Sequence, residues 1–567
     1  MLFTRWCLQK GNFALTQNHS PIWLSGGLLI AIPVALPIGV LLYSLLSPVD
    51  GTGGNGEVWQ HIRQTVLPTY LFNTFVLMAL VGSAATIIGV GTAWLSAKFS
   101  FPLSKILTPA LVLPLAAPAY VVGYVYADLF EFAGPVQSFL RATLELQGGD
   151  YYFPAIRSLG GAALVISLVL YPYIYLLARS SFMQQSVALH ETARVLGADS
   201  NRVFWRVALP VARPAIAGGM ALVLMETVAD YGVVEHFGVP TFTSGIFRTW
   251  YAMGEHAAAL QLAGWLFIIV ALLVVAEQFA RRGEHFNPIS GSASADLLPL
   301  SGLKAIAATV ACAIPVLLGF VLPFAILLNH ALVAGDPLIG KGFSELLFNS
   351  VYVAGIAAIL CAVAALWLNY AQRLRAGVGI KVTVRVATLG YAIPGMVLAV
   401  GLLVPLTFFD RALSGFLRDN FGFTSGLMIT GSVVGLVFVY VARFLTVAYN
   451  SSHMGMTALH YNLDAAARSL GATPSRVLNE IHLPLLRPAV LSGLLLVFID
   501  VMKELPATLI LRPFNFETLA TRVYRLAADE RLGEASTAAL SIILVSLVPT
   551  VMILFTKLTK NSVRNLD

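Results

Sequence analysis

The feature that most constrains this chain is a series of apolar stretches, each about 20 residues long, that recurs from one end to the other. A helix of that length is what crosses the hydrocarbon core of a bilayer. Charged residues make up only 11% of the 567 residues, whereas a soluble domain carries about a quarter. The pattern therefore predicts an all-α membrane protein with about twelve spanning helices, near residues 22–46, 70–96, 106–131, 159–178, 215–237, 259–279, 304–328, 349–370, 387–409, 426–449, 489–511 and 537–556.

The distribution of basic residues predicts the orientation of these spans. Most of the 35 Lys and Arg residues fall on the side of the two termini, Arg443 among them, while Lys503 falls inside a span. Because basic residues concentrate in cytoplasmic loops, both termini are predicted to be cytoplasmic. The formal charge of +7 then follows from this bias and suits an anionic membrane surface, not nucleic acid.

The chain contains one polar, arginine-rich stretch twice. ETARVLGADSNRVFWRVALPVARP (residues 191–214) recurs as DAAARSLGATPSRVLNEIHLPLLRP (residues 464–488), and Phe72-Asn73 recurs as Phe348-Asn349. Two like units in the same direction form a parallel repeat, as in many transporters. The prediction is a first half at 1–280 with a polar loop at 185–213, a cytoplasmic linker at 281–303, and a second half at 304–567 with a loop at 459–487.

Each polar loop is predicted to be two short helices joined by a glycine turn. Gly197 and Gly471 suit the left-handed position that closes a helix. Asp199 or Ser200 in one copy and Thr473 in the other can cap the next helix, which Pro210 is expected to end in the first copy. The apolar residues of that helix fit either packing against lipid or the protein's own bundle, or docking into a groove on a cytoplasmic partner.

Both loops resemble the cytoplasmic loop of ABC-importer permeases, which reads Glu-Ala-Ala, three residues, Gly, and a short helix ending in Leu-Pro. The second copy has Ala465 where the family has Glu, with Asp464 one position earlier. In that family the loop is the coupling helix that inserts into the ATPase subunit. The resemblance carries this role to Glu191, Arg194, Gly197, Val203, Phe204, Leu209, Pro210, Asp464, Arg468, Gly471, Val477, Leu478, Leu483 and Pro484.

The resemblance covers nearly the whole chain as two fused permease domains of the type I ABC importer fold. It implies two copies of a cytoplasmic ABC ATPase, a periplasmic binding protein and a location in the bacterial inner membrane. It also implies that ATP and Mg²⁺ belong to the ATPase and that this chain binds no cofactor. The binding protein is expected at Arg512 and the loop 513–534, which carry charges of both signs.

Two segments inside the predicted membrane bear on the cargo. ETVADYGVVEHFGVPTF (residues 226–242) and DVMKELPATLILRPFNFETLATRVY (residues 500–524) resemble permeases of the ferric-iron ABC importer family. Each opens with two carboxylates four residues apart, which share one face if the helix is continuous. An ionised side chain at that depth costs about 2.5–3.5 kcal/mol. We therefore place five residues in the translocation path or its gate: Glu226, Asp230, Asp500, Lys503 and Glu504.

The carboxylates among these, Glu226, Asp230, Asp500 and Glu504, are candidates for transient contact with iron, because hard cations prefer oxygen ligands. The alternative is a structural network in which Lys503 neutralises Asp500 or Glu504. Tyrosine hydroxyls are further candidate ligands, although tyrosines near span ends more often form the interfacial belt. They are Tyr120, Tyr124, Tyr126, Tyr171, Tyr173 and Tyr175.

No nucleotide-binding motif is found. GDPLIGKG (residues 335–342) nearly matches a P-loop, but Gly342 replaces the Ser or Thr that would hold magnesium. The chain is therefore predicted not to be an enzyme, with ATP hydrolysis in a partner. Two rivals remain open. One is an ABC importer permease of the same architecture that imports thiamine, a polyamine or a phosphonate. The other is an ion-coupled secondary transporter whose buried carboxylates titrate with protons.

Overall fold

The computed structural model describes residues 22–46, 55–148, 150–185, 195, 197, 199–280, 297–333, 341–374, 377–422 and 426–563. In that part of the chain ten helices are long and apolar enough to cross a membrane. A bent pair of helices, Ser104–Ala116 and Ala119–Leu144, makes an eleventh span, and Leu532–Leu547 forms a shorter apolar helix. The predicted all-α membrane protein is confirmed, with ten or eleven spans in the described residues where the sequence predicted about twelve.

The elements of the first half are α2 (Ile22–Leu46), α3 (Asn55–His61), η2 (Ile62–Val66), α4 (Leu67–Lys98), β1 (Phe99–Ser100), α5 (Ser104–Ala110), η3 (Leu113–Ala116), α6 (Ala119–Phe130), α7 (Pro135–Leu144), α8 (Leu159–Gln184), α10 (Ser200–Val203), η4 (Phe204–Ala208), α11 (Leu209–Ala229), α12 (Gly232–His236), α13 (Phe242–Phe247), η5 (Arg248–Ala252) and α14 (His256–Ala280).

The elements of the second half are β2 (Leu298–Pro299), α15 (Gly302–Val316), η6 (Leu317–Val321), α16 (Leu322–Val333), α17 (Lys341–Leu374), α18 (Val378–Ala387), η7 (Gly390–Ala392), α19 (Gly395–Phe421), α20 (Val433–Ala458), α21 (Tyr461–Ser469), α22 (Pro474–Val477), η8 (Leu478–His482), α23 (Leu483–Lys503), α24 (Pro506–Leu511), α25 (Leu519–Ala528) and α26 (Leu532–Val563).

The repeat read from the sequence is present in the packing. Helices α4, α8 and α11 contact one another in the first half as α17, α20 and α23 do in the second. The recurring asparagines show the same equivalence at atomic detail. The Asn73 side-chain amide donates to the Pro240 carbonyl over 2.9 Å, and that of Asn349 donates to the Glu517 carbonyl over 3.2 Å. Each of these bonds ties a long helix to the loop before α13 or α25.

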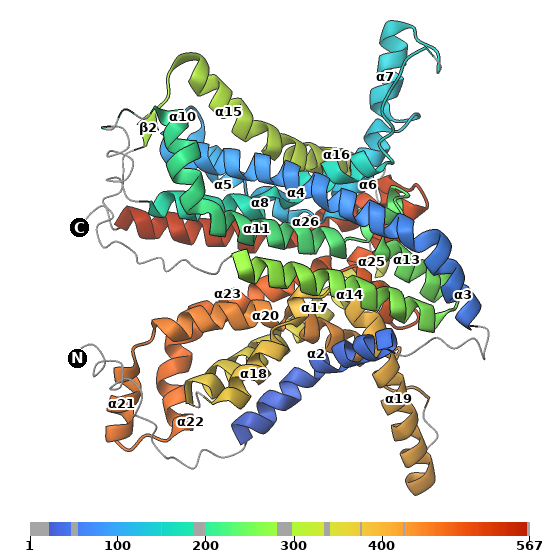
Figure 1. Ribbon diagram of the computed structural model, residues 1–567, viewed down its shortest axis with the longest axis vertical. Coiled ribbons are helices and arrows are strands. Elements are labelled where there is room, and N and C mark those ends of the chain that lie inside the picture. The colour runs from blue at the N-terminus through green and yellow to red at the C-terminus, as the bar shows by residue number, and fades with distance from the viewer. Residues whose placement is uncertain are drawn as a thin grey trace.

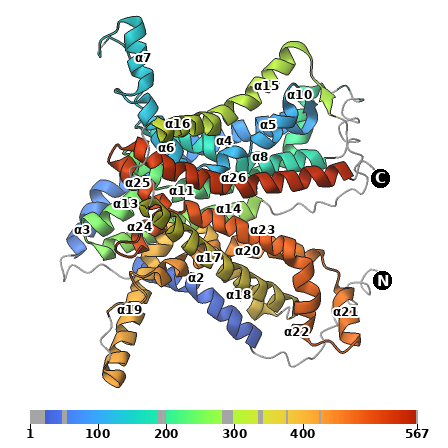
Figure 2. The ribbon, with the colours of Figure 1, turned by 180° about the vertical axis from the view of Figure 1, so that it is seen from behind.

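The first helix of each half packs on the opposite half, which the sequence did not predict. Helix α2 contacts α17, α18, α19 and α20, while α15 contacts α4 and α5 and α16 contacts α6. The rings of Trp23 and Trp367 lie 4.6 Å apart. Figures 1 and 2 show α2 beside α18 and α15 beside α5 from both sides. This exchange holds the two halves together on both flanks.

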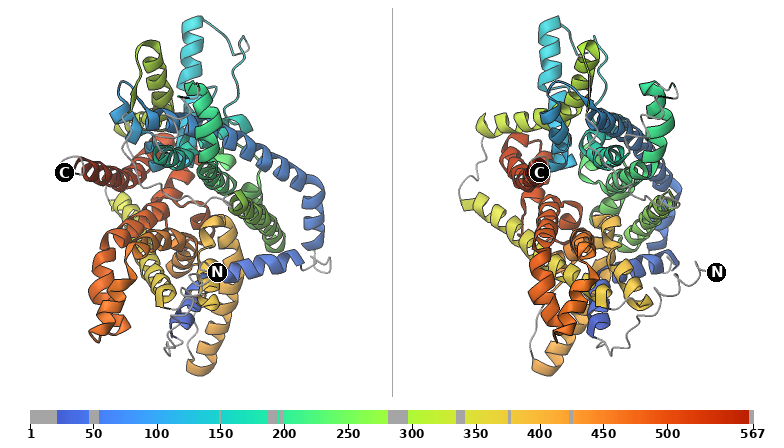
Figure 3. Two further views of the ribbon diagram at one scale, coloured as in Figure 1. Left: turned by 60° about the vertical axis from the view of Figure 1, so that its left-hand side comes forward. Right: turned by 90° about the vertical axis from the view of Figure 1, so that its left-hand side faces the viewer.

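The polar loops lie at one end of the molecule. Helices α10, α21 and α22 are at the left of Figure 1, where α2 begins and α26 ends, whereas α3, α13 and α25 lie at the opposite end. Figure 3 looks toward this loop-bearing end in its right panel and shows α2 and α15 on opposite flanks. The loops therefore share a face with both described ends of the chain.

Pro210 does not end its helix, contrary to the prediction, and neither does Pro484. Apolar helical spans run continuously over Asn201–Ala229 and Pro474–Lys503. A π turn precedes each proline, η4 in one copy and η8 in the other. A π turn shifts the hydrogen-bond register by one residue, which leaves room for a ring that would otherwise clash with a carbonyl one turn back. Two further Leu-Pro pairs, at Pro68 and Pro323, also follow π turns.

Three predicted spans are broken. The stretch 106–131 bends by 92° between Ala116 and Ala119. The stretches 215–237 and 489–511 are interrupted because α11 ends at Ala229 and α23 ends at Lys503. The last two breaks lie at equivalent positions in the repeat, and both occur at a carboxylate.

Candidate functional site

Asp230 and Glu504 lie at the helix breaks and cap the short helices that follow. Asp230 Oδ1 accepts the backbone N–H groups of Val233 and Val234 over 3.0 and 3.2 Å. Glu504 Oε1 accepts the N–H of Ala507 over 3.1 Å. A side-chain oxygen that accepts from the first turn stabilises a helix start. Asp230 and Glu504 therefore lie one residue past the ends of α11 and α23, and the continuous helices that the prediction assumed are not present.

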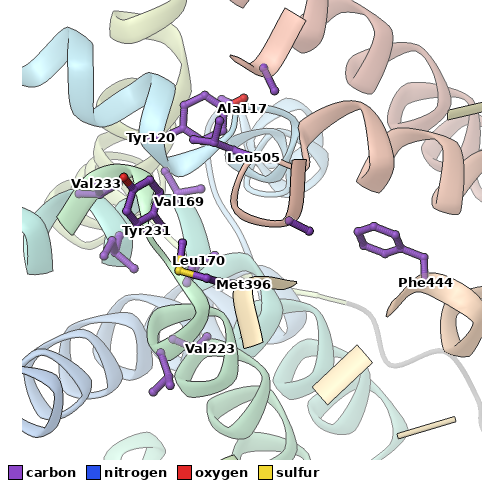
Figure 4. Packing of buried hydrophobic residues seen from close by; sticks show 14 of the residues in the cluster. Ala117, Tyr120, Val169, Leu170, Val223, Tyr231, Val233, Met396, Phe444 and Leu505 are labelled. Atoms are coloured by element: carbon purple, nitrogen blue, oxygen red, sulfur yellow. The ribbon is translucent and has the colours of Figure 1, made fainter. Parts of the chain in front are cut away.

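A cavity of about 150 Å³ nevertheless brings these residues together. Its lining comes from both halves and includes all five residues that the sequence placed in the path or gate: Glu226, Asp230, Asp500, Lys503 and Glu504. Leu170, Tyr231 and Leu505 also line this cavity, and Figure 4 shows them among the buried apolar residues packed in this region. Acidic groups thus face a small space between the halves instead of lipid.

Two basic side chains, Arg443 and Lys503, line the cavity together with the four carboxylates. Arg443 Nε lies 3.5 Å from Glu504 Oε2, and both side chains are less than one tenth exposed. Lys503 Nζ lies 3.5 Å from Asp500 Oδ1. In the described part of the chain, Glu226 has no hydrogen-bond or ion-pair partner within these distances. The Lys503–Asp500 contact is one of the two pairings that the sequence offered for Lys503.

Arg443 was placed on the side of the termini by the sequence and lies instead within the bundle. The predicted span stopped at residue 449, but α20 continues to Ala458, so Arg443 sits near its middle. Its side chain is 8% exposed and lines the cavity. An arginine within an apolar helix needs an anionic partner, and that requirement was the signal that could have identified it.

Gly395 makes room for the Arg443–Glu504 pair. A Cβ atom at this position would overlap Arg443 Nη1 and press against Glu504 Oε1. Gly395 begins α19 directly after Pro394. The Arg443–Glu504 ion pair therefore requires a residue without a side chain at position 395.

The tyrosines expected in an interfacial belt are buried inside the protein. Tyr120, Tyr124, Tyr126, Tyr171 and Tyr175 are each at most 6% exposed. Tyr120 and Tyr173 line the cavity, as do Tyr231 and Tyr391. Four tyrosines thus line the same cavity as the carboxylates. Even so, within the described residues no three His, Cys, Asp or Glu side chains are placed to hold a metal ion together.

The second polar loop has the predicted helix–glycine–helix form. Gly471 has a φ of +80° between α21 and α22, as a left-handed helix end requires. The Thr473 hydroxyl accepts the Arg476 N–H over 3.4 Å, and Pro474 is the first residue of α22. The predicted turn and cap are confirmed.

Asp464 anchors this loop to the bundle. Its carboxylate lies 2.8 Å from Arg373 Nε of α17 and 2.7 Å from His482 Nε2 of η8. Arg373 also donates to the carbonyls of Met456 and Leu459 over 2.8 and 3.2 Å. Burial alone would raise the pKa of Asp464, but these two partners hold it below its usual value. The carboxylate therefore stays ionised at neutral pH, and its stabilising contribution is lost only as the pH falls through that lowered pKa.

The first polar loop is described in part. Glu191 and Arg194 lie outside the described residues, as do residues 281–296 of the linker and 335–340 of the P-loop-like stretch. Gly197 has a φ of +84°, and Asp199 accepts the Arg202 N–H over 3.1 Å just before α10. The predicted glycine turn and aspartate cap are confirmed.

The apolar stripe of the second helix in each loop faces the bundle. Val203 and Val477 are buried at 3 and 4% exposure, and the Phe204 ring lies 5.1 Å from that of Trp94. The exposed apolar groups are others, chiefly Val195, Trp205 and Leu470. Of the remaining carried-over residues, Arg468, Leu483 and Pro484 are exposed, and Phe204, Leu478, Leu209 and Pro210 are partly buried. The apolar residues that the sequence pattern selected therefore pack against the bundle. The apolar residues that face outward could be identified only from the structure.

We expect Gly471→Pro to abolish most transport while the protein still enters the membrane. Proline fixes φ near −65° and cannot adopt the +80° found here. Gly471→Asn should retain more activity, because Asn tolerates the left-handed region. Gly197→Pro is the equivalent change in the first loop. Uptake into proteoliposomes measures all three, and wild-type rates for both proline variants would rule out a coupling role for these turns.

The segment expected to meet a binding protein lies at the end of the molecule opposite the polar loops (Figure 1). Arg512 Nη1 is 3.8 Å from Glu517 Oε1, and Arg525 Nη2 is 3.0 Å from Glu517 Oε2. Phe514 between them is 94% exposed. This surface thus combines paired charges with a protruding aromatic ring.

Comparison with known proteins gives matches in both halves. The family described as "Binding-protein-dependent transport system inner membrane component" matches residues 85–280 and 371–564. The Fe(3+)-transport system permease protein FbpB 2 of Haemophilus influenzae is 26% identical over 94% of this chain and 98% of its own length. The ferric transport system permease protein FbpB of Actinobacillus pleuropneumoniae is 23% identical over 95% and 79%. The molybdenum transport system permease protein ModB of Escherichia coli is 28% identical over 36% and 92%.

Proposed function

Because both halves of this chain belong to the family of binding-protein-dependent transport system inner membrane components, we propose that it forms the complete membrane path of an ATP-driven importer for iron(III). A multi-pass inner-membrane permease of this family works with a binding protein and an ATPase. The single observation that carries the cargo assignment is the similarity to ferric permeases along nearly the whole chain.

The cavity supports iron over an oxyanion. Four carboxylates and two cations line it, so with every group ionised its lining is net negative. Such a lining attracts a trivalent cation and repels molybdate or sulfate. The molybdenum relative, in addition, matches only 36% of the chain, against 94% for the ferric relative. Charge and coverage favour the same cargo.

The two polar loops would each receive one copy of a cytoplasmic ATPase. The exposed loop residues Val195, Trp205 and Leu470 give each loop an outward apolar group, which suits insertion of a helix into a groove. ATP and Mg²⁺ would be held by the ATPase alone. In this proposal both termini would be in the cytoplasm and the surface around Phe514 in the periplasm, where the binding protein would deliver its cargo.

Transport would proceed by alternating access. The cavity lies between the halves, and the loops connect directly to α11 and α23, which end at Ala229 and Lys503 beside it. Closure of the ATPase pair would move both loops and, through these helices, the carboxylates at their ends. The chain's contribution is to bind cargo briefly with carboxylate and phenol oxygens and to open on one side at a time.

ATP hydrolysis by the assembled complex tests the assignment. We expect an iron(III)-loaded ferric binding protein to stimulate hydrolysis several-fold and the same protein without iron to stimulate it less. A thiamine-, polyamine- or phosphonate-binding protein should have no effect. Stimulation by one of those proteins alone would replace iron as the cargo. Transport driven by a proton gradient without ATP would instead support a secondary transporter.

A further inference from the structure

We propose that Arg443 and Lys503 are exchangeable internal counter-ions, which neutralise the pathway carboxylates between transport cycles and leave them when cargo enters. The inference rests on the proposed function only in assigning those carboxylates to the cargo. It adds which groups pair with these carboxylates when cargo is absent, and it predicts that these groups keep small cations out of the empty path.

The Arg443–Glu504 contact is looser than a structural ion pair in the same chain. Arg443 Nε lies 3.5 Å from Glu504 Oε2, and its Nε and Nη1 have no hydrogen-bond partner in the described part of the chain. By contrast, Arg373 Nε lies 2.8 Å from Asp464 and the same guanidinium donates to two backbone carbonyls. Charge-assisted hydrogen bonds of ordinary strength are about 2.7–2.9 Å long. Arg443 is therefore held by charge without being locked in place.

Lys503 shows the same looseness. Its Nζ lies 3.5 Å from Asp500 Oδ1 and 3.4 Å from the Leu115 carbonyl. A lysine has a flexible four-carbon stem, and its ammonium group can move between acceptors. Its side chain is also 22% exposed, which leaves it freer to move than Arg443. Both cations can thus leave their carboxylates without a helix unfolding.

The counter-ions come from one half only, whereas the carboxylates come from both. Within the repeat Glu226 matches Asp500 and Asp230 matches Glu504. At the positions that correspond to Arg443 and Lys503, the first half has Val169 and Ala229, and both of these line the cavity. A purely structural network would have no reason to charge one side of a symmetric cavity. If the role of the cations is only to neutralise part of the carboxylate charge, two of them are enough, and both can come from one half.

Electrostatics explains why the cations are needed. Leaving a buried charge without a partner is costly, so four bare carboxylates in this cavity would recruit protons or small cations. A fixed positive group in a pore forms a barrier against such ions. A trivalent cargo at the same distance attracts a carboxylate three times as strongly as a univalent side chain. Cargo can thus displace a group that keeps univalent ions out.

The test is ion leakage through the complex of permease and ATPase in proteoliposomes, with neither iron nor binding protein present. Arg443→Gln is expected to raise proton and potassium leakage about tenfold or more, because the electrostatic barrier is lost. The double variant Arg443→Gln/Glu504→Gln should return leakage toward the wild-type rate, because charge is removed in a pair. Arg476→Gln is the control, since its pair with Glu480 is exposed on the loop surface.

Gly395→Ala offers a second route that changes no charge. Its methyl group would overlap Arg443 Nη1 and crowd Glu504 Oε1, so it should separate the pair and also raise leakage. If Arg443→Gln fails to assemble, Gly395→Ala and Lys503→Met decide the matter. Liposomes as tight as wild type with every assembled variant would overturn the proposal, as would a double variant that leaks as much as Arg443→Gln. Leakage is measured without iron, so a wrong cargo assignment would leave this result unchanged.

Discussion

Replacing Glu226 with glutamine is expected to lower iron(III) uptake about a hundredfold, which corresponds to about 2.7 kcal/mol of lost cargo stabilisation. Glu226 lines the cavity, and in the described part of the chain no other side chain bonds to it. Glutamine has nearly the same shape but no charge. The loss would therefore report on contact with the cargo and not on collapse of the site. Uptake of labelled iron into proteoliposomes measures it.

Asp230→Asn is the matched comparison for Glu226→Gln. Asp230 lines the same cavity but also caps α12 through the N–H groups of Val233 and Val234. Asn retains the capping oxygen, so this variant removes charge and preserves the helix start. A similar loss in both variants indicates that charge is what the cargo needs. Wild-type uptake by Glu226→Gln would assign the carboxylates to the gate or to packing.

Arg373→Met is expected to separate ATP hydrolysis from transport. Removing one partner of a buried ion pair costs about 3–5 kcal/mol, and the side chains of Arg373 and Asp464 are only 5 and 10% exposed. The second polar loop would then lose its anchor to α17 while its outward surface remains. We expect the iron transported per ATP hydrolysed to fall about tenfold, because 3 kcal/mol is enough to populate a detached loop.

Arg476→Met is the control for that variant. The Arg476–Glu480 pair in the same loop is about 60% exposed on both sides, and exposed pairs of this spacing contribute about 0.3–0.5 kcal/mol. The transport-to-hydrolysis ratio should therefore remain near wild type. Equal ratios for the two variants would show that the anchor of Asp464 has no part in coupling.

Much of the fold follows from local sequence signals. The spans are predictable because about 20 apolar residues suffice to identify each one, and the parallel halves because the same letters recur around Gly197 and Gly471. The glycine turns and the caps at Asp199 and Thr473 are also local chemistry. The exchange of α2 and α15 between halves is not local, because an apolar helix surface does not specify which neighbour it packs against.

The sequence identified which residues line the cavity, but it did not predict how the helices that carry them are arranged. All five predicted path residues line one cavity, although the assumed continuous helices are broken at Asp230 and Glu504. A carboxylate followed by Pro506 at a helix start is a recognisable signal for the second break. Arg443 was missed because the span was predicted at 426–449 and the helix is Val433–Ala458, so a central residue was placed near a helix end. Pro210 was predicted to end its helix and does not, because the π turn before it accommodates the proline ring.

The most direct measurement is uptake into proteoliposomes that hold this chain, its ATPase and its binding protein, with and without internal ATP. Labelled iron(III), thiamine, a polyamine and molybdate are offered in parallel. The proposed function predicts uptake of iron(III) alone, and only when ATP is present. ATP-dependent uptake of one of the other compounds, with none of iron, would contradict the cargo assignment. Uptake of any of them without ATP would contradict the ABC importer mechanism itself.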